Sequence, residues 1–209
     1  MADASLKRLL GIDRSGGPPP ETQKGQPLRP WTIPNAISYV RIGLLPVFLV
    51  VAFESDDGRD AWAAALYWLI AYGDQLDGLA ARITGQYSRL GALLDPLTDR
   101  ALVIAGVVVC WHFDLLPRWA LAVLVAREAF MLVLAQVGLR AGMDLKINMI
   151  GRWAVWPVMF AIFLAMIVDT WVATASLYIG LALTLWATAI YFADGYRFMQ
   201  ARNRPSSST

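Results

Sequence analysis

The sequence predicts an all-α membrane protein, with six transmembrane helices in a compact bundle and an N-terminal segment at the membrane interface. Hydrophobic residues make up 57% of the 209 residues, above the roughly 45–50% of soluble domains. The mean hydropathy is +0.50. Short charged clusters separate apolar stretches of about 20 residues, the length that crosses a bilayer as a helix. A soluble protein of this size could not bury so much apolar surface.

Six stretches are apolar enough to be transmembrane helices. The connections between them are short, which favours an antiparallel bundle. The first stretch contains Pro34 and Pro46, and proline inside a helix predicts a kink or a short interfacial helix before the span. The expected spans are residues 33–54, 60–84, 89–112, 117–140, 147–169 and 173–198.

The spans form one predicted domain, residues 31–200, between two polar tails. Residues 1–30 are rich in proline and glycine and contain no apolar signal segment, so we expect a partly mobile cytoplasmic tail. Within this tail, Leu6 to Ile12 is weakly amphipathic and could lie on the membrane surface. Residues 201–209 end in serine and threonine, which predicts disorder.

The basic residues outside the apolar cores predict the orientation. With a cytoplasmic N-terminus, the opposite side carries only Arg59 and Arg118 among several acidic residues. The cytoplasmic side then carries Lys7, Arg8, Arg14, Lys24, Arg29, Arg82, Arg89, Arg140, Lys146, Arg152, Arg197, Arg202 and Arg204. Lysine and arginine favour cytoplasmic loops, so we expect an integral protein of the cytoplasmic membrane with both termini in the cytoplasm.

Composition also excludes several functional classes. Cys110 is the single cysteine and His112 the single histidine. The chain therefore has no disulfide framework and no cysteine or histidine set for zinc. A net charge of +2 gives no indication of nucleic-acid binding.

Four aspartates stand where membrane helices normally exclude charge. Asp74 and Asp77 are three residues apart, and Asp95 and Asp99 are four apart, so each pair shares one helix face. The turn near residues 84–88 brings the two faces together. Four carboxylates in a low-dielectric site need compensating positive charge. Oxygen ligands suit Mg²⁺ or Mn²⁺, and four carboxylates can hold two such ions, as in two-metal phosphoryl transfer.

These residues carry a family resemblance. The stretch from residue 74 to 99 matches the pattern D-x2-D-G-x2-A-R-x8-G-x3-D-x3-D at every defined position, including Gly78, Ala81, Arg82 and Gly91. It resembles the CDP-alcohol phosphotransferases, which transfer a substituted phosphate group from a CDP-linked lipid to a hydroxyl acceptor. The resemblance covers roughly residues 33–155.

The resemblance implies a role for each matched residue. Asp74, Asp77, Asp95 and Asp99 would bind two divalent cations, Mg²⁺ or Mn²⁺, and Asp99 would also be the catalytic base. Gly78, Ala81, Arg82 and Gly91 would bind the cytidine diphosphate part of CDP-diacylglycerol. A homodimer in the bilayer is also expected from the family.

The acceptor is predicted from residues outside this motif. The segment from Pro34 to Arg41, with Ala126-Arg127-Glu128 and Ile150-Gly151-Arg152, resembles the branch that makes phosphatidylglycerophosphate and cardiolipin. We therefore expect glycerol 3-phosphate as acceptor, giving phosphatidylglycerophosphate; phosphatidylglycerol, giving cardiolipin, is the alternative. No basic residue lies in 132–137, where glycerol-3-phosphate enzymes often have a further arginine, which favours the alternative. The candidate acceptor-binding residues are Arg127, Lys146 and Arg152.

Other interpretations predict different patterns. The aspartates could form structural ion pairs with Arg82, Arg89 and Arg100, and Arg127 could pair with Glu128 to join helices. Lys146 and Arg152 could be cytoplasmic anchors. A cation transporter would disperse acids through the membrane depth, whereas these acids cluster at one end of the second and third spans.

Overall fold

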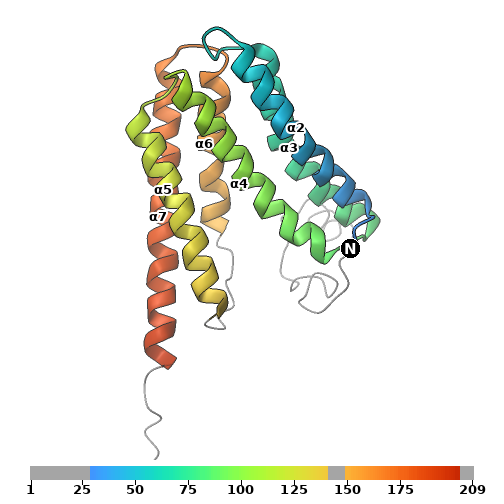
Figure 1. The fold of residues 1–209 in the computed structure, drawn as a ribbon. Helices are drawn as coiled ribbons and strands as arrows, with labels where there is room; N and C mark the ends of the chain where they lie inside the picture. The colour runs from blue at the N-terminus through green and yellow to red at the C-terminus, as the bar shows by residue number, and fades with distance from the viewer. Residues whose placement is uncertain (1–28, 141–148, 203–209) are drawn as a thin grey trace, which may run out of the picture. The chain divides into compact units, whose positions relative to one another are not determined.

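The computed structural model describes residues 29–140 and 149–202, and within these ranges all regular secondary structure is α-helical. The predicted all-α class is therefore confirmed. Figure 1 shows the helices in chain order. They are α2 (Ile33–Glu54), α3 (Ala61–Thr84), α4 (Arg89–His112), α5 (Arg118–Arg140), α6 (Met149–Ala165) and α7 (Trp171–Arg202).

The helix boundaries follow the predicted spans closely for α2 to α5. The fifth predicted span is too long, because α6 ends at Ala165 and the chain turns before Asp169. The sixth is too short, because α7 continues to Arg202. Most of the predicted tails, 1–30 and 201–209, lies outside the described residues, namely residues 1–28, with Leu6 to Ile12, and residues 203–209. Residues 201 and 202, which were expected to be disordered, belong to α7.

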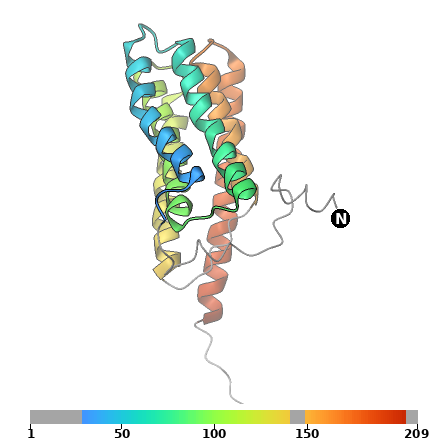
Figure 2. The same cartoon turned by 90° about the vertical axis from the view of Figure 1, so that its right-hand side faces the viewer.

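The chain divides into two compact units, and the boundary along the chain falls within α4, between Gly106 and Val107. In the first unit, α2 and α3 run side by side, as Figures 1 and 2 show. Their core includes the buried rings of Phe48 and Tyr67, whose centroids are 5.5 Å apart. Ile70 and Leu102 are also fully buried. This packing fixes α2 against the part of α3 that leads to the aspartates.

Side chains and one glycine define the helix ends in this unit. Thr32 caps α2 by accepting a hydrogen bond from the Asn35 N–H, and Asp60 caps α3 by accepting from the Trp62 and Ala63 N–H groups. Gly85 ends α3 with φ of +66°, a left-handed conformation that glycine adopts without strain. The chain therefore reverses between the two aspartate pairs, as the sequence predicted.

In the second unit, α7 packs against both α6 and α5. The rings of Trp119 on α5 and Tyr178 on α7 stack with centroids 5.4 Å apart. Gly180 is buried where α7 meets α6: an added Cβ would lie 2.6 Å from Val158 Cγ2 and 2.8 Å from its backbone nitrogen. The close approach of α6 and α7 thus depends on glycine at this position.

Two of the described helices are long and apolar enough to cross a membrane by length and composition, namely α2 and residues Trp171–Ala193 of α7. Residues Ala154–Ala165 of α6 are apolar but shorter. In α3 and α4 the aspartates and neighbouring arginines interrupt the apolar sequence. Six membrane spans therefore remain a prediction, which the helix count supports.

Replacing Gly180 by alanine should separate α6 from α7. The new methyl group would meet the backbone of α6, which cannot move as a flexible side chain can, so we expect a loss of about 1–3 kcal/mol in stability. The measurement is thermal unfolding of the purified protein in detergent. Gly43→Ala in α2 is the matched control, since nothing lies within 4 Å of its Cβ position. Equal stability of both variants would contradict the packing at Gly180.

Candidate active site

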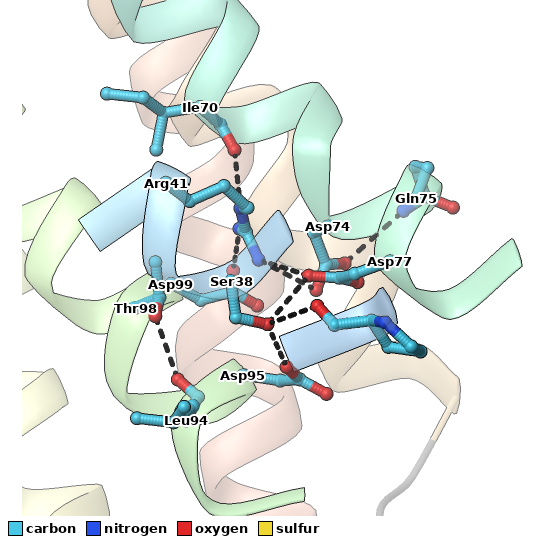
Figure 3. Close-up of polar contacts among 11 residues, drawn as sticks. Ser38, Arg41, Ile70, Asp74, Gln75, Asp77, Leu94, Asp95, Thr98 and Asp99 are labelled. Atoms are coloured by element: carbon cyan, nitrogen blue, oxygen red, sulfur yellow. Dashed lines mark hydrogen bonds and ion pairs between the residues drawn. The ribbon is translucent and has the colours of Figure 1, made fainter. Parts of the chain in front are cut away.

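The four predicted metal-binding aspartates come together between α3 and α4. Asp74 and Asp77 lie on α3, and Asp95 and Asp99 lie on α4. Figure 3 shows the four carboxylates around side chains from α2. The Asp77 side chain is 4% exposed and that of Asp99 is 39% exposed. The Asp77 carboxylate is therefore buried, whereas that of Asp99 is partly accessible.

Helix α2 contributes three buried polar side chains, Asn35, Ser38 and Arg41, each three residues after the last. This spacing places them on one helix face. They interrupt a helix that is otherwise apolar enough to cross a membrane. All three contact α3, α4 or the segment before α2, so this face of α2 forms one wall of the site.

Arg41 connects the two aspartate pairs. Its Nη1 donates to Asp77 Oδ2 at 3.0 Å and its Nη2 donates to Asp99 Oδ1 at 2.8 Å. Asp74 Oδ1 lies 3.7 Å from Nη1. The Nε donates to the Ile70 carbonyl of α3 at 2.9 Å, and the arginine side chain is 2% exposed. One guanidinium thus contacts aspartates of both α3 and α4 (Figure 3).

Ser38 contacts the remaining aspartate. Its Oγ lies 3.3 Å from Asp95 Oδ1 and 3.4 Å from Asp77 Oδ2, and also 3.3 Å from the Pro34 carbonyl of its own helix. A hydroxyl has one hydrogen to donate, so these acceptors share it. Ser38 and Arg41 together contact all four aspartates.

Asn35 positions the beginning of α4. Its Nδ2 donates to the Arg29 and Pro30 carbonyls, and its Oδ1 accepts from Ser88 Oγ at 2.8 Å. Ser88 Oγ in turn accepts from the Gly91 N–H at 2.9 Å, which makes Ser88 the N-cap of α4. An added Cβ on Gly91 would lie 2.7 Å from Asn35 Oδ1. Gly91 therefore permits close packing between α4 and α2.

Arg41 changes the expected charge balance of the site. The sequence analysis assigned the compensating charge to divalent cations, or to Arg82, Arg89 and Arg100 as a structural alternative. The structure adds a guanidinium that neither interpretation included. Among the described residues, no group of three or more histidine, cysteine or acidic side chains is arranged around one metal position. The donor set itself, four carboxylates from two facing helices, has the hard oxygen chemistry that suits Mg²⁺ or Mn²⁺.

Three of the four predicted nucleotide-binding residues, Gly78, Ala81 and Arg82, lie in the last two turns of α3, and Gly91 lies on α4. An added Cβ on Gly78 would make ordinary van der Waals contact with Arg82 Nη2 at 3.7 Å. Ala81 and Arg82 are half-buried. Gly78 and Arg82 are thus near each other beside Asp77. Gly91, in contrast, packs against the side chain of Asn35.

The predicted acceptor-binding residues are placed only in part. Arg127 on α5 pairs with Glu128 and donates from Nε to Thr188 Oγ1 of α7 at 3.0 Å. It therefore joins α5 to α7, as the ion-pair interpretation expects. Lys146 lies outside the described residues, and only the helical backbone of Arg152 is described.

The comparison with protein families identifies this constellation. The sequence model described as CDP-alcohol phosphatidyltransferase matches residues 31–186. The chain belongs to this family. The match includes α2, with its polar face, and both aspartate pairs, and it extends into α7.

Curated relatives in the family have two different names. A Streptomyces coelicolor protein named cardiolipin synthase (CMP-forming) is 34% identical over 199 residues, covering 91% of this chain and 93% of the relative. A Bacillus subtilis protein named CDP-diacylglycerol–glycerol-3-phosphate 3-phosphatidyltransferase is 30% identical over 144 residues, covering 63% and 75%. A human cardiolipin synthase (CMP-forming) is 36% identical over 104 residues, covering 49% and 34%.

The contribution of α2 to this site was not predicted from the sequence. Asn35, Ser38 and Arg41 indicated only a branch of the family, although Arg41 is a charge within an apolar span. A charge in that position indicates a functional or paired residue. Applied to Arg41, this rule marks a functional or paired residue but does not name its partners.

Alanine substitutions at Gly78 and Gly91 should have different effects on stability, because only Gly91 is closely packed. Gly91→Ala should lower stability by about 1–3 kcal/mol, because the methyl group would displace Asn35. Gly78→Ala meets only ordinary van der Waals contact and should keep the melting temperature of the wild type. Thermal unfolding of both variants checks this difference. A Gly91→Ala protein as stable as Gly78→Ala would contradict the Asn35 contact.

Proposed function

We propose that this chain transfers the phosphatidyl group of CDP-diacylglycerol to a glycerol-phosphate-type acceptor and releases CMP, in anionic phospholipid synthesis. The observation that carries the proposal is the convergence of Asp74, Asp77, Asp95 and Asp99 between α3 and α4 in a member of the CDP-alcohol phosphatidyltransferase family. The family description supports the donor and the reaction class. The names of the relatives support the acceptor class.

The aspartates are proposed to hold two divalent cations, Mg²⁺ or Mn²⁺. Bound cations would supply positive charge to the diphosphate of the donor. The chain's own residues provide the frame for this: α3 and α4 present the carboxylates, and Ser38 and Arg41 contact them from α2. The arrangement favours positioning and electrostatic stabilisation over a covalent intermediate.

Asp99 is the proposed general base. Its side chain is far more exposed than that of Asp77, so a substrate hydroxyl can approach it. The acceptor hydroxyl would give its proton to Asp99 while its oxygen bonds to the β-phosphorus. The bond from that phosphorus to the oxygen of CMP then breaks, and CMP leaves with the bonding electrons.

The end of α3 is the proposed site for the cytidine diphosphate. The nearest atom to an added Cβ on Gly78 is Arg82 Nη2 at 3.7 Å, so Gly78 and the guanidinium of Arg82 lie close together next to Asp77. A guanidinium can contact two phosphate oxygens at once. Gly78, Ala81 and Arg82 are therefore proposed to contact the nucleotide, and Gly91 to act through the placement of α4.

The surface of the helices supports a protein embedded in the bilayer. Val40, Val47 and Val50 on α2 are each about half exposed or more, although α2 is one of the apolar helices. Trp119 and Trp171, at the starts of α5 and α7, are also largely exposed, as is typical of aromatic residues at membrane interfaces. Six spans, cytoplasmic termini and a homodimer complete the proposal, from the charge pattern and the family resemblance.

Glycerol 3-phosphate and phosphatidylglycerol are both glycerol-phosphate-type acceptors. The Bacillus subtilis relative supports the first, and the Streptomyces coelicolor relative, which aligns over nearly the whole chain, supports the second. The pairing of Arg127 with Glu128 also favours the second. A partly neutralised arginine suits the single charge of a phosphodiester better than the near-double charge of a phosphate monoester.

Asp99→Asn should abolish phosphatidyl transfer. The amide keeps the shape of the side chain but cannot accept the proton, so we expect a loss in kcat of about a hundredfold or more. The measurement is CMP release from CDP-diacylglycerol, with the lipid product identified by mass spectrometry. Asp57→Asn, on an exposed loop residue, is the control and should retain activity. Unchanged activity in Asp99→Asn would exclude this residue as the base.

The acceptor assignment is tested by offering glycerol 3-phosphate and phosphatidylglycerol separately. If Arg127 binds the acceptor phosphate, Arg127→Ala should raise the acceptor KM about tenfold or more, the effect of losing a charged hydrogen bond, and leave the donor KM unchanged. If Arg127 and Glu128 form a structural ion pair, Arg127→Ala should change the acceptor KM, the donor KM and the melting temperature together. Thr188→Val is a useful comparison, because it removes the hydrogen bond from α7 and keeps the arginine.

A further inference from the structure

Arg41 is buried beside the proposed reaction site, although no step of the proposed reaction uses it. Its guanidinium is buried on α2 and contacts Asp77 on α3 and Asp99 on α4, with Asp74 also within ion-pair distance. A charge is costly to bury without partners, and here the partners are the residues proposed to bind cations.

We propose that Arg41 is a positioning residue that acts as a built-in counter-ion, holding the α3 and α4 aspartates together before cations bind. Gly73 provides the space in which its side chain lies. This inference rests on the proposed function, in which the same aspartates bind divalent cations.

The first support is that Arg41 bridges two helices. Asp77 and Asp99 belong to different helices, and like charges brought together in a protein interior repel one another. The Nη1 and Nη2 groups of one guanidinium donate to both, at 3.0 and 2.8 Å. Each hydrogen bond uses one carboxylate oxygen, and a carboxylate has two. A cation can therefore reach the same aspartates while competing with Arg41 for their negative charge.

The second support is the fit between Arg41 and Gly73. An added Cβ on Gly73 would lie 2.7 Å from Arg41 Cδ, 2.9 Å from Cγ and 3.1 Å from Nε. These atoms are the middle of the side chain, and its Nε is fixed by the Ile70 carbonyl. A methyl group at this position would therefore displace the whole arginine. Gly73 precedes Asp74 directly, so the same turn of α3 carries a ligand and the space for its counter-ion.

The inference predicts how stability depends on cations. Without Arg41, the metal-free aspartates lose the guanidinium that contacts three of them, so their repulsion is less compensated and the metal-free protein is destabilised. A bound cation then supplies the missing charge and meets no competing guanidinium. Because a ligand stabilises the folded state according to its affinity, the cation should stabilise the Arg41→Ala protein more than the wild type.

The experiment uses the full-length protein in detergent and measures melting temperature during titration with MgCl₂ or MnCl₂ after treatment with EDTA. In Arg41→Ala we expect a lower melting temperature in EDTA, a larger rise with cation, and a half-maximal cation concentration at least about tenfold lower. Phe48→Ala is the matched control: it removes a buried ring between α2 and α3 without changing charge. It should lower the melting temperature and leave the cation response unchanged.

A double-mutant cycle tests the Gly73 contact without cations. Gly73→Ala should lower the melting temperature in EDTA in the wild-type background, and much less in Arg41→Ala, where the colliding side chain is absent. Gly43→Ala, on the same helix as Arg41 but with open space around it, should show no such coupling. If Arg41→Ala does not fold, Arg41→Lys replaces it. Lysine keeps the positive charge but lacks the two Nη groups that donate to Asp77 and Asp99. Arg41→Lys should therefore give an intermediate cation response.

The outcomes separate this inference from the proposed function. Equal cation responses in the wild type, Arg41→Ala and Phe48→Ala, or a cycle without coupling, would overturn the role of Arg41 even if the wild type released CMP. Coupling and a stronger cation response in Arg41→Ala would support it even if no acceptor gave a lipid product. The lack of a lipid product with every acceptor would overturn only the phosphatidyl-transfer proposal.

Discussion

The site depends on one buried guanidinium. Arg41 of α2 donates hydrogen bonds to Asp77 of α3 and Asp99 of α4, and to the Ile70 carbonyl. Removing one partner from a buried ion pair costs about 3–5 kcal/mol, because the other charge is left without compensation. The arrangement of three helices in the first unit is therefore tied to the charges of the aspartates, and packing alone does not determine it.

Small residues and apolar contacts in this unit accommodate the polar side chains of α2. Gly73 leaves room for the arginine side chain, and Gly91 lets α4 approach Asn35. Phe48 and Tyr67 fix α2 against α3 further along the same helices. Apolar packing thus sets the distance between the helices, while the polar face of α2 sets where the carboxylates lie.

The sequence was sufficient for the helices, and for the aspartates, because both follow from local periodicity. Apolar stretches of fixed length predict helices, and spacings of three and four place Asp74 with Asp77 and Asp95 with Asp99. The role of α2 was missed because it depends on contacts between residues that are far apart in the chain. Gly91 illustrates this: its neighbour Asn35 is 56 positions away, so the spacing within the motif could not identify Asn35 as the side chain that α4 packs against.

The charges of the site also indicate an order of binding. With all four carboxylates ionised and one guanidinium among them, the cluster has a formal charge of −3. The diphosphate of a CDP-linked lipid carries about two further negative charges, and like charges repel strongly where water is excluded. Arg41 can hold the aspartates together, but even with the positive charge of Arg82 added, the formal charge stays at −2 and does not favour a diphosphate. The donor should therefore bind only after the aspartates have acquired further positive charge. In the proposed function, the site is held in shape by its own arginine and would bind its substrate through the cations that the aspartates take up.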